Sequence, residues 1–178
     1  MNIKLIAGIG NNLKQYYDTR HNVGIWFINN FIKKYSLNLK YNNKINCFFS
    51  KLKLNNNNLI LLIPNSFINL SGIYIKKSII YFKINSNELL IVHDDLYFNI
   101  GKFKIKFGGS SAGHNGVKSI INNIYNNFYR LRIGIKNYKN IDNISDFVLS
   151  EPNKLEKNII LNSINDSIEY IINFLDKN

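Results

Sequence analysis

The chain has 178 residues, of which 46% are hydrophobic and 13% aromatic, so it can bury a compact core, and we expect a single domain over residues 1–178. Lys and Arg number 23 against 11 Asp and Glu, a formal charge of +12 that favours a polyanionic partner such as nucleic acid. Cys47 is the only cysteine, which excludes an internal disulfide and fits a reducing cytoplasm, and no apolar run approaches the roughly 20 residues that a membrane-spanning helix needs.

Short apolar or alternating runs bounded by Asn, Gly or Pro predict β-strands, and apolar residues at spacings of three and four predict helices. In chain order they are a strand at Lys4–Ile9, a helix at Val23–Tyr35, strands at Ile45–Lys53, Leu59–Ile63, Leu89–His93 and Lys102–Phe107, a helix at Val117–Ile124, a strand at Tyr129–Ile135 and a helix at Leu155–Leu175. Pro152 lies just ahead of the last helix, a common position for proline near a helix start.

This alternation of strands and helices predicts an α/β fold, a single three-layer domain with a mixed, mostly parallel sheet flanked by helices. The Asn55–Asn58 run between two strands predicts an antiparallel hairpin. In such folds a ligand lies beyond the carboxyl ends of the strands. We therefore expect the functional residues at such positions, which are occupied by Asn11, Asn69, Asp94 and the glycine-rich segment Gly108–Gly116.

Two nucleotide-binding signatures are incomplete. Gly8-Ile9-Gly10 begins like a dinucleotide fingerprint, but Leu13 stands where the third glycine is needed. The segment Gly108–Gly116 lacks the Gly-Lys-Ser/Thr end of a P-loop. We therefore expect no nucleotide cofactor. The glycine-rich segment can still bind a phosphate or a ribose, or it can simply connect a strand to a helix.

His21 precedes the apolar period that starts at Val23, so we expect it at the N-terminal end of a helix, where the positive helix end lowers the pKa of an imidazole. Asp94 and Asp95 follow the apolar run Leu89–His93, and a carboxylate emerging there can orient the His21 ring through a hydrogen bond. On residue type alone, His21 could equally cap a helix, and the paired aspartates could form a turn or bind a divalent metal.

Basic residues flank the glycine-rich segment. On one face of a sheet they would form a surface that follows a nucleic-acid backbone, whereas isolated lysines on an edge strand are often only solvated. These residues are Lys102, Lys104, Lys106, Lys118, Arg130 and Arg132. An anionic membrane surface is the weaker alternative partner, because the basic residues are scattered rather than collected on one amphipathic helix.

Five ordered segments carry a resemblance to a known family. They are Tyr16-x-x-Thr19-Arg20-His21-Asn22, Pro64-x-x-Phe67-x-Asn69-x-Ser71-Gly72, Val92-His93-Asp94-Asp95-Leu96, Gly113-His114-Asn115-Gly116-x-Lys118-Ser119-Ile120 and Phe128-Tyr129-Arg130-Leu131-Arg132-Ile133-Gly134-Ile135. With them the chain resembles the bacterial-type peptidyl-tRNA hydrolases from Lys4 to about Leu161. The resemblance implies a monomeric enzyme without cofactor or metal. Such an enzyme hydrolyses the ester between peptide and ribose in peptidyl-tRNA and so recycles tRNA from prematurely released chains.

The resemblance also implies residue roles. His21 matches the catalytic histidine that activates the attacking water without a covalent intermediate, and Asp94 matches the carboxylate that orients this histidine. The residues matched to substrate binding are Asn11, Tyr16, Asn69 and Asn115, and Asn22 matches a supporting position. The residues matched to tRNA binding are Lys106, His114 and Arg132, of which Lys106 and Arg132 form a clamp on the terminal phosphate.

The first loop departs from the family pattern, because Asn11-Asn12-Leu13 stands where Asn-Pro-Gly is usual, so the amide is kept and the stiffening proline is lost. Two other functions stay open. One is a non-catalytic RNA-binding protein on the same scaffold, which would not demand the full set of polar residues. The other is a metal-dependent nuclease that uses Asp94 and Asp95, although no further carboxylate cluster accompanies them.

Overall fold

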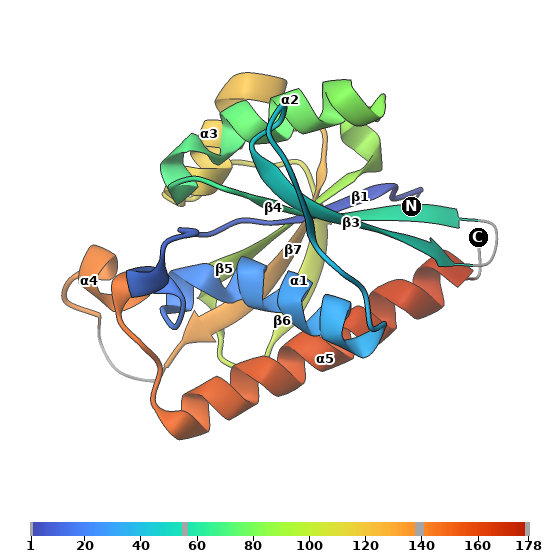
Figure 1. The fold of residues 1–178 in the computed structure, drawn as a ribbon. Coiled ribbons are helices and arrows are strands. Elements are labelled where there is room, and N and C mark those ends of the chain that lie inside the picture. The colour runs from blue at the N-terminus through green and yellow to red at the C-terminus, as the bar shows by residue number, and fades with distance from the viewer. Residues whose placement is uncertain (1, 55–56, 138–140, 177–178) are drawn as a thin grey trace.

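In the computed structural model, which describes residues 2–54, 57–137 and 141–176, seven strands form one mixed sheet in the order β2-β3-β4-β1-β5-β7-β6 (Figure 1). The strands are β1 (Leu5–Gly8), β2 (Lys40–Asn42), β3 (Cys47–Leu54), β4 (Asn57–Pro64), β5 (Leu89–Asn99), β6 (Phe103–Phe107) and β7 (Tyr129–Lys136). The central strands β4, β1, β5 and β7 are parallel to one another, and antiparallel pairs lie at both edges. The predicted α/β fold with a mixed sheet is confirmed.

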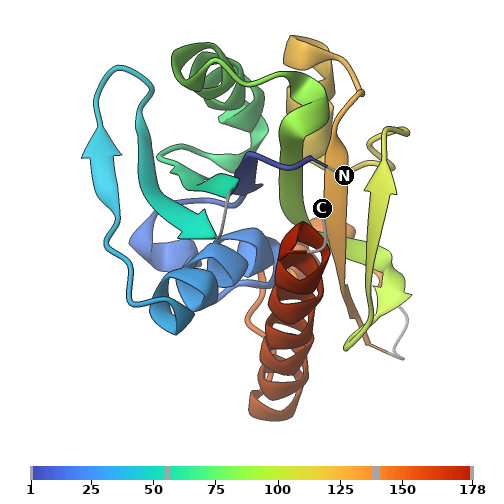
Figure 2. The same ribbon diagram turned by 90° about the vertical axis from the view of Figure 1, so that its right-hand side faces the viewer.

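Helices cover both faces of this sheet, which gives the predicted three layers. The helices are α1 (Val23–Lys34), α2 (Ser71–Phe82), α3 (Asn115–Ile124), α4 (Ile144–Leu149) and α5 (Lys154–Asp176). Figures 1 and 2 show α1 and α5 on one face and α2 and α3 on the other. Each face has its own apolar core, one built around Phe27, Phe31 and Ile164 and the other around Ile75 and Ile120. Within the described part of the chain, none of the helices combines the length and apolar character that crossing a bilayer requires.

Several elements differ from the sequence prediction. The pattern does not indicate α2, because its buried face carries Ser71, Gly72 and Ser78 beside Ile75 instead of an apolar stripe. It also misses α4, which is short, and the three-residue edge strand β2. The predicted hairpin is confirmed by antiparallel pairing of β3 with β4, although its turn at residues 55–56 lies outside the described residues.

The strand β5 continues to Asn99, past its predicted end at His93. Asp94 and Asp95 therefore lie inside the strand rather than after it, and the predicted strand end is wrong. The physical reason is that β7 keeps pairing with β5 through Asp94 and Asp95, whereas the neighbour on the other side, β1, stops at Gly8. Beyond Val92, this edge of β5 pairs with no other strand of the described residues.

A close approach of α1 to the sheet fixes the segment that precedes the helix. A Cβ on Gly24 would lie 2.4 Å from the Val92 carbonyl oxygen and 2.5 Å from that of Ile9, so only glycine fits there. The 3₁₀ turn η2 (Arg20–Asn22) leads directly into α1, and this contact holds it beside the carboxyl end of β1 and the middle of β5.

We expect Gly24→Ala to lower the free energy of unfolding by about 1–3 kcal/mol, because the new methyl group meets backbone atoms that cannot move independently. Chemical denaturation measures the change. Asn29→Ala, at an exposed position of the same helix, is the matched control and should stay within about 0.5 kcal/mol of the unmodified protein. Equal stability of the two variants would contradict the close packing of α1.

Candidate active site

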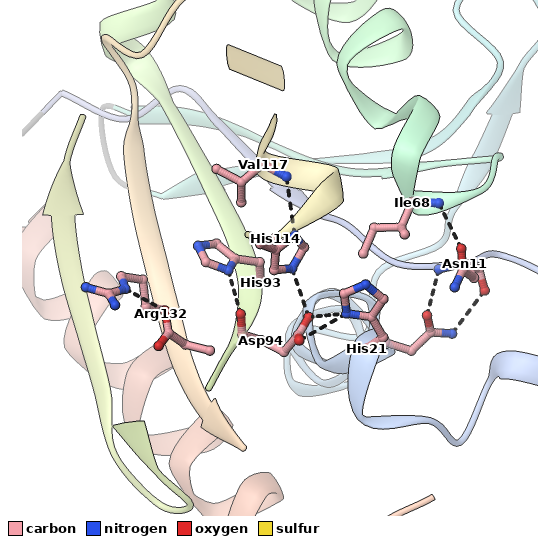
Figure 3. Close-up of polar contacts among 10 residues, drawn as sticks. Asn11, His21, Ile68, His93, Asp94, His114, Val117 and Arg132 are labelled. Atoms are coloured by element: carbon pink, nitrogen blue, oxygen red, sulfur yellow. Dashed lines mark hydrogen bonds and ion pairs between the residues drawn. The ribbon is translucent and has the colours of Figure 1, made fainter. Parts of the chain in front are cut away.

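His21, Asp94 and His114 come together beyond the carboxyl end of β1, whereas Lys106 and Arg132 lie on β6 and β7. Because β1 stops at Gly8, opposite Val92, Asp94 on β5 lies beyond it with no strand on that side. The turn η2 approaches this space from the α1 layer, and the N-terminus of α3 approaches it from the opposite layer (Figure 3). Ligand sites of open α/β sheets commonly lie beyond the carboxyl ends of the parallel strands.

His21 and Asp94 form a buried hydrogen-bonded pair, as the sequence predicts. The Nδ1 atom of His21 lies 2.9 Å from Oδ1 and 3.0 Å from Oδ2 of Asp94 (Figure 3). An ionised carboxylate can only accept hydrogen bonds, so Nδ1 carries the ring proton and Nε2 keeps its lone pair. Nε2 has no hydrogen-bond partner within residues 2–54, 57–137 and 141–176. The ring is therefore presented as a base with its acceptor nitrogen available.

The electrostatics of the pair differ from the prediction for His21. Burial lowers the pKa of His21, but the charge of Asp94 and the hydrogen bond to it outweigh burial, so the pKa lies above the ordinary 6.5. The predicted lowering of this pKa is wrong, because a carboxylate in direct contact outweighs a helix end. Burial raises the pKa of Asp94, yet the charges of His21 and His114 and their hydrogen bonds hold it well below 3.8.

His114 joins the same cluster, and its contact with Asp94 is not predicted from the sequence. Its Nε2 lies 3.0 Å from Oδ1 of Asp94, and its Nδ1 accepts a 3.3 Å hydrogen bond from the backbone N–H of Val117 at the start of α3. The His114 ring lies 4.8 Å from that of His21. Both ring nitrogens are engaged, so the tRNA contact expected of His114 stays a prediction that would have to use the face or edge of the ring.

His93 packs behind this cluster. Its Nδ1 donates a 2.6 Å hydrogen bond to the backbone carbonyl of Asp94, and its ring stands edge-on to that of His114 at 4.8 Å. Burial, together with the charge of His114, lowers the pKa of His93 to about 3, so this ring is neutral at physiological pH. Its buried Nε2 has no hydrogen-bond partner in the described part of the chain.

One group of side chains has the spacing of a metal site. Ligand atoms of His21, Asp94 and His114 lie within 4.8 Å of one another. The hydrogen bonds oppose coordination there, because the N–H of Val117 places the ring proton of His114 on Nε2, the nitrogen that a metal would need. Metal binding would therefore cost both the contact with Asp94 and the cap of α3.

Asn11 and Asn22 fasten the loop after β1 to the His21 turn. Asn22 donates 3.0 Å from Nδ2 to the Asn11 carbonyl, and its Oδ1 accepts from the Asn11 N–H at 2.7 Å. The Oδ1 atom of Asn11 accepts a 2.8 Å bond from the N–H of Ile68 (Figure 3). Asn12 donates to Asn65 at 3.0 Å and to the carbonyl of Ser66 at 3.2 Å, so side-chain and backbone bonds hold the loop that lacks the usual proline.

The remaining predicted substrate-binding residues lie in segments that adjoin those of His21, Asn11 and His114. Tyr16 ends the 3₁₀ turn η1 (Lys14–Tyr16), Asn69 lies in η3 (Ile68–Leu70), and Asn115 is the first residue of α3. Asn69 and Asn115 are exposed. The side chains of these three residues form no hydrogen bond with the other described residues, so their amide and hydroxyl groups are available to a ligand.

The basic residues on β6 and β7 share one face of the sheet. Lys104 lies opposite Arg132 and Lys106 opposite Arg130, and opposite residues of an antiparallel pair point the same way. Arg132 donates from Nε to Asp95 at 2.7 Å and lies 4.5 Å from the centre of the Phe98 ring. Lys106 is exposed. Four of the six predicted basic residues therefore lie on one face of the sheet, and contact of this face with nucleic acid stays a prediction.

Buried Arg130 holds the glycine-rich loop beside this surface. Its guanidinium donates to the carbonyl of Gly108 and, at 2.7 Å, to that of Ser110. The loop contains Gly109-Ser110-Ser111-Ala112-Gly113, which matches the Gly-x-Ser-x-Gly spacing of serine hydrolases. No histidine of the described residues is hydrogen-bonded to the Ser111 hydroxyl, so the loop lacks the base that a serine nucleophile needs.

Arg20 provides a tether that the sequence does not reveal. Its Nη2 lies 2.6 Å from Oε2 of Glu156, and its Nη1 donates to the Ser150 hydroxyl at 2.7 Å and the Glu151 carbonyl at 3.0 Å. The guanidinium also lies 4.5 Å from the centre of the Phe147 ring. Arg20 precedes His21, so the turn η2 is anchored to the start of α5 as well as to the loop of Asn11. No local sequence pattern signals a contact across 136 residues.

The chain is similar to known proteins over nearly its whole length. The family model for peptidyl-tRNA hydrolase matches residues 5–178. The chain is 42% identical to a peptidyl-tRNA hydrolase of Buchnera aphidicola, with 93% of this chain and 94% of the relative covered, and 43% identical to one of Vesicomyosocius okutanii, with 100% and 93% covered. The crystal structure of peptidyl-tRNA hydrolase from Acinetobacter baumannii superposes with a TM-score of 0.92 at 32% identity, over 99% of this chain and 89% of that one. The chain therefore belongs to the peptidyl-tRNA hydrolase family.

Proposed function

We propose that this enzyme hydrolyses the ester between the peptide and the tRNA ribose of peptidyl-tRNA, with His21 as the general base. The observation that carries the proposal is the buried His21–Asp94 pair, in which Nδ1 is bound and Nε2 is available. The charge of Asp94 and the hydrogen bond to it raise the pKa of His21 against the effect of burial, which makes the ring a stronger base.

The reaction begins when Nε2 of His21 removes a proton from a water molecule that attacks the ester carbonyl carbon. The imidazolium formed is stabilised by the ionised carboxylate of Asp94. The tetrahedral intermediate then collapses, the bond to the ribose oxygen breaks, and this oxygen takes the proton from Nε2. The products are tRNA with a free ribose hydroxyl and a peptide carboxylic acid, which releases its proton to solvent, and no covalent intermediate forms.

Amide side chains near the His21–Asp94 pair suit three further tasks: placing the water, stabilising the developing charge and binding the peptide. The exposed amide of Asn115, next to His114, can place the water and stabilise the developing negative charge. Asn11 and Asn69, which border Ile68, and the hydroxyl of Tyr16 can bind the peptide. Asn22 supports the site by its two hydrogen bonds to the backbone of Asn11.

The basic face of β6 and β7 suits the tRNA. Asp95 and Phe98 hold the guanidinium of Arg132, and neither Nη atom has a hydrogen-bond partner in the described residues, so both can meet a phosphate. Lys106 on β6 lies opposite Arg130 on β7, next to the glycine-rich loop. We infer that Lys106 and Arg132 clamp the terminal phosphate of the tRNA and that the enzyme works as a single-domain monomer in the cytoplasm.

A non-catalytic RNA-binding role and a metal-dependent nuclease are the competing functions. The first does not account for a buried His21–Asp94 pair with an available base. The second would need Asp94 and Asp95 to bind one metal, but neighbouring strand residues point to opposite faces, and the two carboxylates contact His21 and Arg132 instead. A discharge assay on N-blocked aminoacyl-tRNA with and without EDTA separates them. We expect ester hydrolysis that EDTA does not reduce; cleavage of the RNA chain, or activity abolished by EDTA, would sink the proposal.

We expect His21→Ala to reduce the discharge rate by about 10²–10⁴-fold, because the base is lost, while tRNA binding stays nearly intact. Single-turnover discharge measures the rate, and a binding titration with deacylated tRNA measures the affinity. Preserved turnover with lost binding would instead assign His21 to RNA recognition.

Asp94→Asn should shift the pH dependence in a definite direction. The charge of Asp94 raises the pKa of His21 against burial, so its removal lowers this pKa, and the acidic limb of kcat/KM moves to lower pH. At the same time kcat should fall by about 100-fold or more, because the ring is no longer held with its proton on Nδ1. The rate of discharge against pH measures both effects. A limb that moves to higher pH would contradict the proposed pairing.

Lys106→Ala and Arg132→Ala should each weaken tRNA binding and reduce its salt dependence. Each lost phosphate contact lowers the slope of log affinity against log salt by roughly 0.7–0.9. Lys51→Ala, an exposed lysine on β3 in the other half of the sheet, removes the same charge and is the matched control. If the control variant loses as much slope as the other two, the effect comes from net charge and the clamp is rejected.

A further inference from the structure

We propose that His114 is a positioning residue of the reaction, which holds the carboxylate of Asp94 in place for His21. The two rings share one oxygen: Nδ1 of His21 lies 2.9 Å, and Nε2 of His114 lies 3.0 Å, from Oδ1 of Asp94. This inference rests on the proposed hydrolysis and adds a third member to its dyad.

The backbone of α3 fixes which nitrogen of His114 is the donor. His114 caps this helix, and its Nδ1 accepts the N–H of Val117 at 3.3 Å. A ring nitrogen that accepts a hydrogen bond carries no proton, so the proton of the neutral ring is on Nε2, which faces Asp94. The helix cap therefore selects the tautomer that can donate to the carboxylate.

Within the part of the chain that the structure describes, only two side chains hold the Asp94 carboxylate in place. It is buried, and the described residues that donate to its oxygens are His21 and His114 alone. His93 bonds the Asp94 carbonyl and stands edge-on to His114, which limits movement of both. The ionisable groups that face the carboxylate are thus the two rings, and His93 with Arg130 behind it lies one layer further away.

Loss of the His114 donor would have a chemical consequence as well as a geometric one. With one donor fewer, the negative charge on Asp94 is less dispersed and interacts more strongly with His21. The pKa of His21, already raised by the Asp94 charge against burial, would then rise further. The carboxylate would also be free to turn, so the orientation of the His21 ring would be lost for part of the time.

Two substitutions separate the two hydrogen bonds of His114. In His114→Asn the amide oxygen can still accept from Val117 as a helix cap, but the side chain is too short to reach Asp94. In His114→Gln the longer side chain can place its amide N–H near the position of Nε2 and donate to Asp94. Thermal unfolding of both variants shows whether the cap and the fold are kept.

We expect His114→Asn to lower kcat by about tenfold or more, to leave KM for peptidyl-tRNA nearly unchanged and to move the acidic limb of kcat/KM to higher pH. His114→Gln should recover much of the lost kcat. A raised KM with unchanged kcat and an unshifted limb would make His114 a tRNA contact and overturn the inference, as would equal losses of kcat in both variants. An inactive unmodified protein would refute the proposed hydrolysis itself, which keeps the two failures distinct.

Discussion

A carboxylate buried on a β-strand must be compensated by hydrogen-bond donors, because an uncompensated charge in the interior costs several kcal/mol. The compensation for Asp94 comes from both helical layers, through the ring of His21 on one side and that of His114 on the other. This requirement explains much of the local construction. Gly24 lets α1 approach the sheet, and the cap of α3 turns His114 toward the strand.

The alternation of side chains along β5 gives neighbouring residues different tasks. Consecutive residues of a strand point to opposite faces of the sheet. Asp94 pairs with His21 of the α1 layer, whereas Asp95 accepts from Arg132 on the face that carries the basic residues of β6 and β7. One strand thus links the proposed chemistry and the proposed phosphate contact, with a separation fixed by the pleat. A shift of one residue in the pairing of β5 with β7 would exchange the two aspartates.

Local patterns carried most of the fold. Strands with continuous apolar runs, such as β1 and β4, and helices with a wide apolar face, such as α1 and α5, were predicted within a few residues. The helix α2 was missed because Gly72 and Ser78 occupy the face that packs on its neighbours, where close approach matters more than hydrophobic area. The pairing of His21 with Asp94 was expected from the resemblance and from strand-end geometry. The role of Arg20 was not, because its partners are brought near only by the complete fold.

The tether from Arg20 to Glu156 joins one of the first functional segments of the chain to one of the last structural ones. A ribosome makes His21 early, but the contacts that pin its turn are complete only once the start of α5 has been added. The contacts that hold the His21 turn are therefore complete only after Glu156, 136 residues beyond Arg20, has been synthesised. Contacts between residues so far apart in sequence form slowly. A nascent chain lacking this helix would hold the dyad residues without the framework that aligns them.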